Sequence, residues 1–422
     1  MACRLSISGT VDPMTDLYDV VVVGGGPAGA AAALRARQLR PAARVLILDA
    51  ADFPRDKACG DGIAPHALDE LARLGVADAA AGYRPVRRLR VTSPGQATVV
   101  ASLARPDYVV PRKVFDARLV AAAVQAGAEF RRHRVRRLTV RPSWVECDGV
   151  AAGRVVIGAD GANSAVRRQI GIRATAHAHT AVAVRGYALA PGGPQEQRIA
   201  MVSQGWPAYA WSFPIGDGSV NVGFGKLRTR IGEEGRGGRA ELYDRLAELL
   251  PDLPADPATL RAHHLPLSSG RPRQPDGRVL LAGDALSLIN PLTGEGIYYA
   301  VLSGRLAAEA AIGAAAGSAA AAGSAVRAGA GAGAGAGSAY RQALRRELGR
   351  HLWQTALLTR AGQLPGFLDA GVRAADRRPD VFEVAVELGL GRGTVPVRLL
   401  ASVAGGWFSS RLSGDRGRSE SR

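Results

Sequence analysis

The stretch FPRDKACGDG, residues 53–62, concentrates reactive groups in one short loop. It holds a thiol, two acids and two bases, and a glycine stands on each side of its last acid, Asp61. A thiol can donate a proton or hold a substrate, whereas a carboxylate at its ordinary pKa is a poor acid at neutral pH. We therefore take Cys59 and Asp61 as candidate catalytic residues, with Asp61 chiefly fixing the loop geometry. A surface turn, with Cys59 as a small buried apolar residue, is the alternative.

A glycine-rich turn precedes this loop. Gly24, Gly26 and Gly29 follow four valines and open a helical segment, and Asp49 ends the next strand-like segment. Glycines let the backbone approach a pyrophosphate, the helix start offers free N–H groups, and the acid accepts from ribose hydroxyls. The pattern predicts a dinucleotide site but does not by itself distinguish NAD from FAD.

Two later segments make that distinction. GADGANS, residues 158–164, contains Asp160 and Gly161, and GRVLLAGDA, residues 277–285, contains Gly283 and Asp284. They resemble the second and third motifs of flavoproteins with the p-hydroxybenzoate hydroxylase fold. The resemblance implies FAD as the cofactor, with Asp284 on its ribityl chain and Asp160 positioning it.

Two further cofactor-binding positions follow from the same resemblance. Gly294 and Gly296 start a predicted helix whose dipole would face the flavin pyrimidine edge and stabilise negative charge there. Arg112 stands where this fold places a basic residue near the cofactor. A solvated charge at a helix start is the alternative for Arg112.

An aromatic stretch indicates which group of these flavoproteins the chain resembles. The segment YAWSFP is followed, after eight residues, by GFG. In a strand its three aromatic residues face one side and form an apolar wall roughly 13 Å long. The alternative is an ordinary core face of the sheet. The pattern resembles the signature of geranylgeranyl reductases, and the loop around Cys59 resembles their cysteine-containing active-site loop. The substrate-binding candidates are Tyr209, Trp211, Phe213, Pro214, Gly223 and Gly225.

This resemblance, over residues ~17 to 310, implies an FAD-dependent oxidoreductase that reduces carbon–carbon double bonds of an isoprenoid lipid or prenyl quinone. Hydride would come from reduced flavin and a proton from near Cys59. An aromatic monooxygenase or halogenase of the same fold is the alternative, and a flavin-binding protein without turnover is a third interpretation. No second GxGxxG unit occurs, so no dedicated nicotinamide domain is expected, and the candidate electron donors are NADPH visiting the flavin, a ferredoxin or another carrier.

Periodicity predicts an α/β protein with a Rossmann-type FAD-binding domain, an inserted mixed or antiparallel β-sheet substrate domain and a C-terminal helical region. The expected boundaries are a flexible N-terminus (1–16), the FAD-binding domain (17–85, 111–175, 277–312), the substrate domain (86–110, 176–276), an Ala/Gly/Ser linker (313–339), the helical region (340–407) and a disordered tail (408–422). Helices are expected at 64–80, at 113–127 and from about Gly294.

Composition limits partners and location. The net charge of +17 is carried almost wholly by arginine, but no window matches a nucleic-acid-binding module, so nucleic acid is excluded as a partner. Three scattered cysteines predict neither a disulfide framework nor a metal site. No segment has the length of a signal peptide or a membrane span. The expected location is the cytoplasm, in peripheral contact with an anionic membrane at its inner face.

Overall fold

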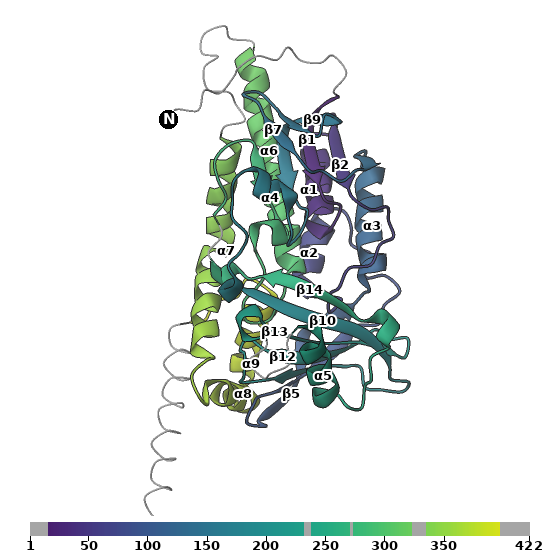
Figure 1. Ribbon diagram of the computed structural model, residues 1–422, viewed down its shortest axis with the longest axis vertical. Coiled ribbons are helices and arrows are strands. Elements are labelled where there is room, and N and C mark those ends of the chain that lie inside the picture. Colours follow the sequence, from purple (N-terminus) through teal and green to yellow (C-terminus); the bar gives the residue numbers. More distant parts are fainter. Residues whose placement is uncertain (1–15, 232–237, 271–272, 323–334, 397–422) are drawn as a thin grey trace, which may run out of the picture.

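The computed structural model describes residues 16–231, 238–270, 273–322 and 335–396. Its strands form two sheets, one with seven strands and one with eight. Figure 1 shows the sheet with β1, β2 and β9 at one end of the molecule and the sheet with β10, β12 and β13 at the other. The long helices α6 and α7 run beside each other.

The first sheet is built on parallel strands. Its centre is formed by buried β-branched and leucine residues, as in VVVV at the end of the first strand and VLILD in the second, a composition typical of a sheet covered on both faces. Its order is β6 (Glu129–Arg132), β2 (Val45–Asp49), β1 (Leu17–Val23), β9 (Ala151–Gly158), β8 (Val145–Cys147) and β7 (Leu138–Val140), with β15 (Val279–Leu281) beside β9.

Small residues let helices pack closely on this sheet. Helix α1 (Pro27–Leu39) is rich in buried alanine, and it lies against α6 (Ile297–Ala322). A Cβ at Gly304 of α6 would overlap the backbone of Ala28, so this contact requires a glycine. The other helices of this half are α2 (Pro65–Arg73), α3 (Arg112–Gln125) and α4 (Ala165–Gln169).

The second sheet is antiparallel except where β11 runs parallel to β4. Its order is β14 (Arg261–Pro266), β10 (Thr180–Leu189), β13 (Ser219–Leu227), β12 (Tyr209–Pro214), β11 (Glu196–Met201), β4 (Val86–Thr92), β5 (Thr98–Val109) and β3 (Gly62–Ile63). Helix α5 (Arg239–Leu249) packs on β13 and β10. The short strand β3 belongs to the loop that contains Cys59, so this loop is tied to the edge of the second sheet.

Three helices complete the described chain. Helix α7 (Ala336–Ala361) packs along α6, and α8 (Phe367–Arg377) and α9 (Pro379–Leu390) cover β5. Leu89, Val99 and Leu103 of the second sheet form one apolar cluster with Val372 and Phe382 of these helices. The C-terminal helices therefore cover one face of the second sheet at β4 and β5.

The expected fold class is confirmed: a sheet of the FAD-binding type is joined to a mixed, mainly antiparallel sheet and to C-terminal helices. Some expected helix bounds are wrong. Helix α2 ends at Arg73 rather than near residue 80, because the chain turns through Gly75 at φ +83°. Helix α7 begins at Ala336 rather than near residue 340, whereas helix α6 begins at Ile297, close to the expected start near Gly294, and continues to Ala322. Residues 1–15, 323–334 and 397–422, which include the expected tail, lie outside the described residues.

Candidate active site

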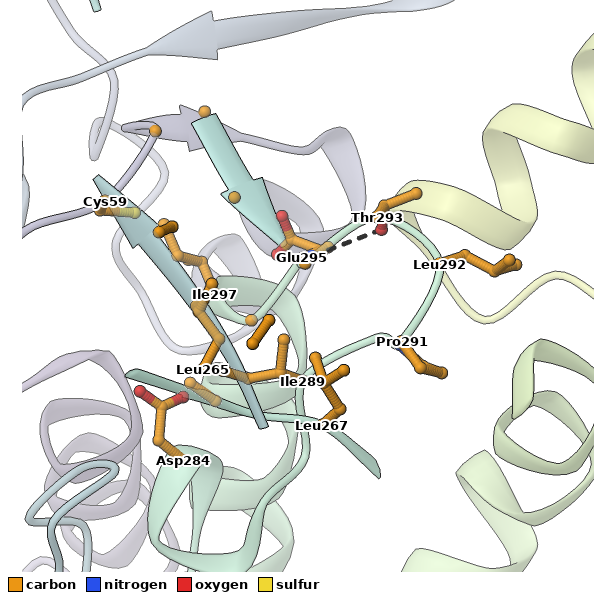
Figure 2. Close-up of a pocket in the computed structure, with 18 of the residues that line it drawn as sticks. Cys59, Leu265, Leu267, Asp284, Ile289, Pro291, Leu292, Thr293, Glu295 and Ile297 are labelled. Carbon is orange, nitrogen blue, oxygen red and sulfur yellow. Dashed lines mark hydrogen bonds between the residues drawn. The ribbon is translucent and has the colours of Figure 1, made fainter. Parts of the chain in front are cut away.

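A cavity of about 1230 Å³ lies where the two sheets and the C-terminal helices meet. This exceeds the usual 300–1,000 Å³ of a small-molecule pocket, as suits a site for a cofactor together with a second molecule. Figure 2 shows Cys59, Asp284 and Glu295 around the cavity, with apolar side chains between them. Of the sequence-predicted residues, the cavity wall includes Gly24, Gly26, Asp49, Cys59, Arg112, Asp160, Gly161, Tyr209, Trp211, Phe213, Gly225, Asp284, Gly294 and Gly296.

The glycine turn has the shape of a pyrophosphate cradle. A Cβ at Gly24 would overlap the Ala159 carbonyl, and one at Gly29 would overlap the Gly24 carbonyl, so both glycines allow close backbone contacts. A Cβ at Gly26 would instead meet only the Arg55 guanidinium, at an ordinary contact distance of 3.7 Å. Helix α1 starts here without a side-chain cap or an acidic residue in its first turn. Its free N–H groups therefore fit a phosphate at this point.

Asp49 and Arg55 lie beside the glycine turn. One Asp49 oxygen accepts the N–H of Gly25 at 2.7 Å and the other accepts that of Ala51 at 2.9 Å. Arg55 lies 3.6 Å from Asp49 and 3.3 Å from the buried Asp116. The Asp49 carboxylate thus holds the turn in place, and its contact with a ribose stays a prediction.

The third motif is connected to the candidate active-site loop. Lys57 of the loop forms a 3.0 Å ion pair with Asp284. Burial acts to raise the pKa of Asp284, but Lys57 and His263 reverse this and the pKa is lowered. Asp284 is therefore a carboxylate with oxygen atoms on the cavity wall, as a site for ribityl hydroxyls needs. Gly283, at φ +57°, packs against Ala28 and brings the third motif close to α1.

The second motif serves mainly to hold its own turn. The Asp160 carboxylate accepts from the Ser164 hydroxyl at 2.5 Å and from the Ala165 N–H at 2.6 Å, so it caps α4. Arg167 of α4 donates to Ser287 Oγ at 3.0 Å and thereby ties the second motif to the segment after the third. Gly161, at φ +77°, has open space where a side chain would stand.

Arg112 is buried and its charge is neutralised. It forms a bidentate pair with Asp116, at 2.6 and 2.8 Å, within α3. Arg112 also belongs to the cavity wall. Arg112 is therefore neither solvated nor free to pair fully with an anion.

The two catalytic candidates lie on opposite sides of their loop. Cys59 lines the cavity, and burial raises the pKa of its thiol although the charge of Arg112 opposes this. Asp61 is fully buried outside the cavity wall, at φ +60°. It accepts from the Tyr187 hydroxyl at 2.7 Å and from the Asn221 amide at 2.8 Å. Asp61 thus holds the loop in position, and Cys59 is the member of the pair that can meet a substrate.

The aromatic and glycine residues of the signature are cross-strand partners. Tyr209 faces Gly225 and Trp211 faces Gly223 in the β12–β13 pair. A Cβ at Gly223 would overlap the Trp211 indole, so the ring lies on the bare backbone of the neighbouring strand. The three aromatic rings follow one another at centroid distances of 6.0 and 6.4 Å and line the cavity. The predicted aromatic wall is therefore present.

Asn221 is a site residue that sequence reasoning missed. It stands opposite Phe213, accepts from Trp211 Nε1 at 2.9 Å, and donates to the Cys59 carbonyl at 2.9 Å and to Asp61. It therefore fixes the aromatic wall to the Cys59 loop. The sequence signal that could have pointed to Asn221 was its position in the interval between Pro214 and Gly223 of the signature.

The segment before α6 lies on the cavity wall, and the contact of Gly294 and Gly296 with a flavin stays a prediction. Gly294, at φ +69°, leaves room for the Tyr209 hydroxyl, which donates to the Thr293 carbonyl. The Glu295 carboxylate accepts the Tyr298 N–H at 2.7 Å and so caps α6. Burial raises the pKa of Glu295 to about 7. The start of α6 thus presents a carboxyl group to the same cavity that Cys59 lines, which its position in the sequence did not predict (Figure 2).

The rest of the cavity is apolar. Side chains of α7, α8 and α9 line it opposite the second sheet, among them Leu358, Leu368, Val372, Phe382 and Leu388. None of these helices carried a sequence motif. In the described part of the chain, no cluster of His, Cys, Asp and Glu has the arrangement of a metal site, and no helix has the length and apolarity to cross a membrane.

The comparisons with known proteins agree with this geometry. A family model described as an FAD binding domain matches residues 17–190. The chain is 36% identical over 325 residues to a menaquinone reductase of Mycolicibacterium smegmatis, covering 70% of this chain and 76% of that protein. It is 31% identical over 318 residues to digeranylgeranylglycerophospholipid reductase 2 of Methanopyrus kandleri, covering 70% and 76%.

A solved structure extends the similarity to the C-terminal helices. The geranylgeranyl bacteriochlorophyll reductase-like protein of Thermoplasma acidophilum matches with a TM-score of 0.73 over 92% of this chain and 96% of that chain. At 21% identity this match shows the shared fold. With the FAD cradle, the aromatic wall and the two curated reductases, the chain belongs to the geranylgeranyl reductase family of FAD-dependent oxidoreductases.

Proposed function

We propose that this protein reduces carbon–carbon double bonds in the isoprenoid side chain of a prenyl quinone. One observation carries the proposal: the cavity joins the FAD cradle at Gly26 to an apolar channel between the second sheet and the C-terminal helices. The relative that is 36% identical is named for menaquinone, and the archaeal lipid reductase is 31% identical, which favours a quinone over a glycerophospholipid.

The residues of the chain have distinct roles in this reaction. Bound FAD in its reduced form supplies the hydride. The aromatic wall of Tyr209, Trp211 and Phe213 orients the prenyl chain, and the side chains of α8 and α9 exclude water around it. The Cys59 thiol faces the same space and either contacts the substrate or holds a proton near it.

The test uses purified protein loaded with FAD and reduced without oxygen. Incubation with a menaquinone that has an unsaturated side chain should give a product heavier by two hydrogens, seen by mass spectrometry. A digeranylgeranylglycerophospholipid in a parallel reaction tests the lipid alternative. Halogenases share the fold, so the same protein is also incubated with oxygen, a halide salt and an aromatic substrate. Addition of oxygen or halogen, with no reduction, would overturn the proposal.

The role of Cys59 is tested separately with Cys59→Ala and Cys59→Ser. If the thiol takes part, both variants should bind FAD normally but reduce the substrate at least about tenfold more slowly. Unchanged reduction with a normal flavin spectrum would remove Cys59 from the reaction and leave it as a wall residue.

We also propose that NADPH or a ferredoxin delivers electrons to the bound flavin. Anaerobic addition of each donor to the FAD-loaded protein, followed by the loss of the oxidised flavin absorbance, distinguishes the two.

Peripheral contact with an anionic membrane completes the proposal. Helix α7 exposes a row of side chains on one face, which we call the α7 stripe. Its positions are spaced by three or four residues. Leu357 and Leu364 of the stripe also line the cavity, so the stripe borders its mouth. The α7 stripe consists of Arg346, Arg350, Trp353, Leu357, Arg360 and, just after the helix, Leu364.

A further inference from the structure

Asp107 is a buried carboxyl group that faces the cavity without full hydrogen bonding. It lies near the end of β5, is 3% exposed and belongs to the cavity wall. The Gln197 side chain hydrogen-bonds to it, but Oδ1 has no partner. A buried carboxylate oxygen without a partner is costly, whereas a protonated carboxyl avoids the charge. The environment therefore favours the acid form of Asp107.

Asp107 lies where the Cys59 loop meets the apolar channel. Strand β5 pairs with β3 through Val109 and Gly62, only two residues beyond Asp107. A Cβ at Gly62 would lie 3.7 Å from the Phe213 ring and 3.9 Å from Gln197 Nε2, the side chain that bonds Asp107. One end of the aromatic wall, the loop and Asp107 therefore share one part of the cavity.

Among the described charged groups near β5, Glu295 is the one that acts on Asp107. Burial raises the pKa of Asp107 to about 8, and the negative charge of Glu295 adds to this. The other nearby charges are paired elsewhere: Arg105 with Asp69 of α2, Glu196 of β11 with Arg88 and Arg90, Asp369 of α8 with Ser93, and Glu387 of α9 with His66.

We infer that Asp107 is the acid that protonates the alkene carbon that does not receive the hydride, and that Glu295 is a positioning residue that keeps Asp107 protonated. This rests on the proposed function. One alkene carbon accepts the hydride supplied by reduced flavin, and the other accepts the Asp107 proton. The π bond is lost, two C–H bonds form, the flavin is left oxidised, and the Asp107 carboxylate recovers a proton from water.

Asp107 suits this task better than the two acids near it in the loop. A general acid works best when its pKa is close to the working pH. The Cys59 thiol has a pKa raised above its usual 9.0, which makes it a weaker acid than Asp107. Asp61 lies outside the cavity wall; its Oδ2 accepts from Tyr187 and Asn221, and its Oδ1 accepts from the backbone N–H of Arg112. Of these three groups, Asp107 alone combines contact with the cavity and a moderately raised pKa.

The kinetic test measures how fast a prenyl quinone oxidises the reduced FAD-loaded protein in the absence of oxygen, from pH 6 to 9.5. In the wild-type protein the rate should fall about tenfold per pH unit above pH 8, as Asp107 loses its proton. Asp107→Asn should be at least about 100-fold slower at pH 7, and Asp107→Glu should recover part of the rate. Glu295→Gln, which keeps an oxygen to cap α6, should lower the pH at which the rate begins to fall.

An infrared titration gives a second readout that needs neither cofactor nor turnover. The cofactor-free wild-type protein at pH 7 should show the carbonyl band of protonated carboxylic acids, with a component from Glu295 that disappears near pH 7 and a component from Asp107 that disappears as the pH rises through 8. Asp107→Asn should lack the component that titrates near pH 8, and Glu295→Gln should keep a component from Asp107. The matched control Asp69→Asn removes an exposed carboxylate outside the cavity, and it should retain both the band and the wild-type rate.

The outcomes separate the two proposals. If the wild-type protein reduces no isoprenoid substrate, the proposed function and the role of Asp107 in it are both wrong, although its protonation is still read from the infrared band. If the wild type is active and Asp107→Asn reacts at the same rate with a normal flavin spectrum, only the inference about Asp107 is wrong. Absence of a band component that titrates near pH 8 and is missing from Asp107→Asn would also overturn it.

Discussion

At the scale of single residues, the site depends on polar side chains that hold other groups in place. Asp61 is the clearest case, because its carboxylate connects Tyr187, Asn221 and the backbone of Arg112 around the Cys59 loop. A carboxylate without access to solvent is costly even with such partners. Burial accordingly raises the pKa of Asp61 from 3.8 to about 6, although the Tyr187 hydrogen bond opposes this.

This pKa predicts a pH-dependent effect of Asp61→Asn on stability. Because the folded-state pKa is raised, the contribution of Asp61 is fully present below pH 3.8 and is lost as the pH rises through 6. The asparagine variant has no such loss. The free energy of unfolding of Asp61→Asn should therefore lie furthest below that of the wild-type protein near pH 4. Above pH 6 this difference should be smaller by about 3 kcal/mol. Urea denaturation of both proteins from pH 4 to 7.5 measures this, and a constant difference would contradict the pKa.

At the scale of elements, the β12–β13 pair forms the aromatic wall. Gly223→Ala should destabilise the protein by about 1–3 kcal/mol, because the new methyl group overlaps the Trp211 indole and an overpacked site must shift. It should also displace the ring from the cavity wall and lower substrate affinity. Gly225→Ala is the matched control, since its Cβ would lie 3.2 Å from Ala183, a tight contact that can relax. Equal effects of the two variants on thermal stability would argue against this account.

The elements also show what the sequence could predict. The glycine turn at Gly24–Gly29 and the buried valine strand were predictable because their signals are local and periodic. The partnership of Lys57 with Asp284 was not, because the two residues are 227 positions apart. The same holds for Asp107 and Glu295, which reach one cavity from β5 and from the start of α6. Asp61 was predicted as part of the loop, but only its burial outside the cavity wall shows that it supports the Cys59 loop on the side away from the cavity.

At the scale of the whole molecule, charge and shape combine at one surface. The chain carries a net charge of +17, and the α7 stripe places arginines beside exposed apolar side chains at the cavity mouth. Trp353 is 56% exposed and Leu357 is 48% exposed, which is unusual for side chains of this kind. A prenyl quinone resides in a membrane, so an amphipathic border around the mouth would let its side chain enter without crossing water.

This arrangement predicts salt-sensitive binding to anionic vesicles. The wild-type protein should pellet with vesicles of phosphatidylglycerol at low salt and be released at high salt, because each arginine near the surface contributes about 1 kcal/mol. The double variant Trp353→Ser, Leu357→Ser should bind at least about tenfold more weakly. Leu189→Ser, which removes an exposed leucine at the end of β10, is the control and should bind like the wild type. Binding that ignores both salt and the double variant would rule out this surface.

The pairing of Trp211 with Gly223 also explains the interval between the aromatic and glycine parts of the signature. In an antiparallel hairpin, the length of the turn determines which residues face each other. The number of residues between Pro214 and Ser219 therefore determines that Trp211 faces Gly223. Inserting one residue there would place Val222 opposite the indole, a side chain where the ring needs bare backbone. The spacing thus encodes a distance across the sheet, and a hairpin of another length with the same aromatic residues would leave no level surface for a prenyl chain.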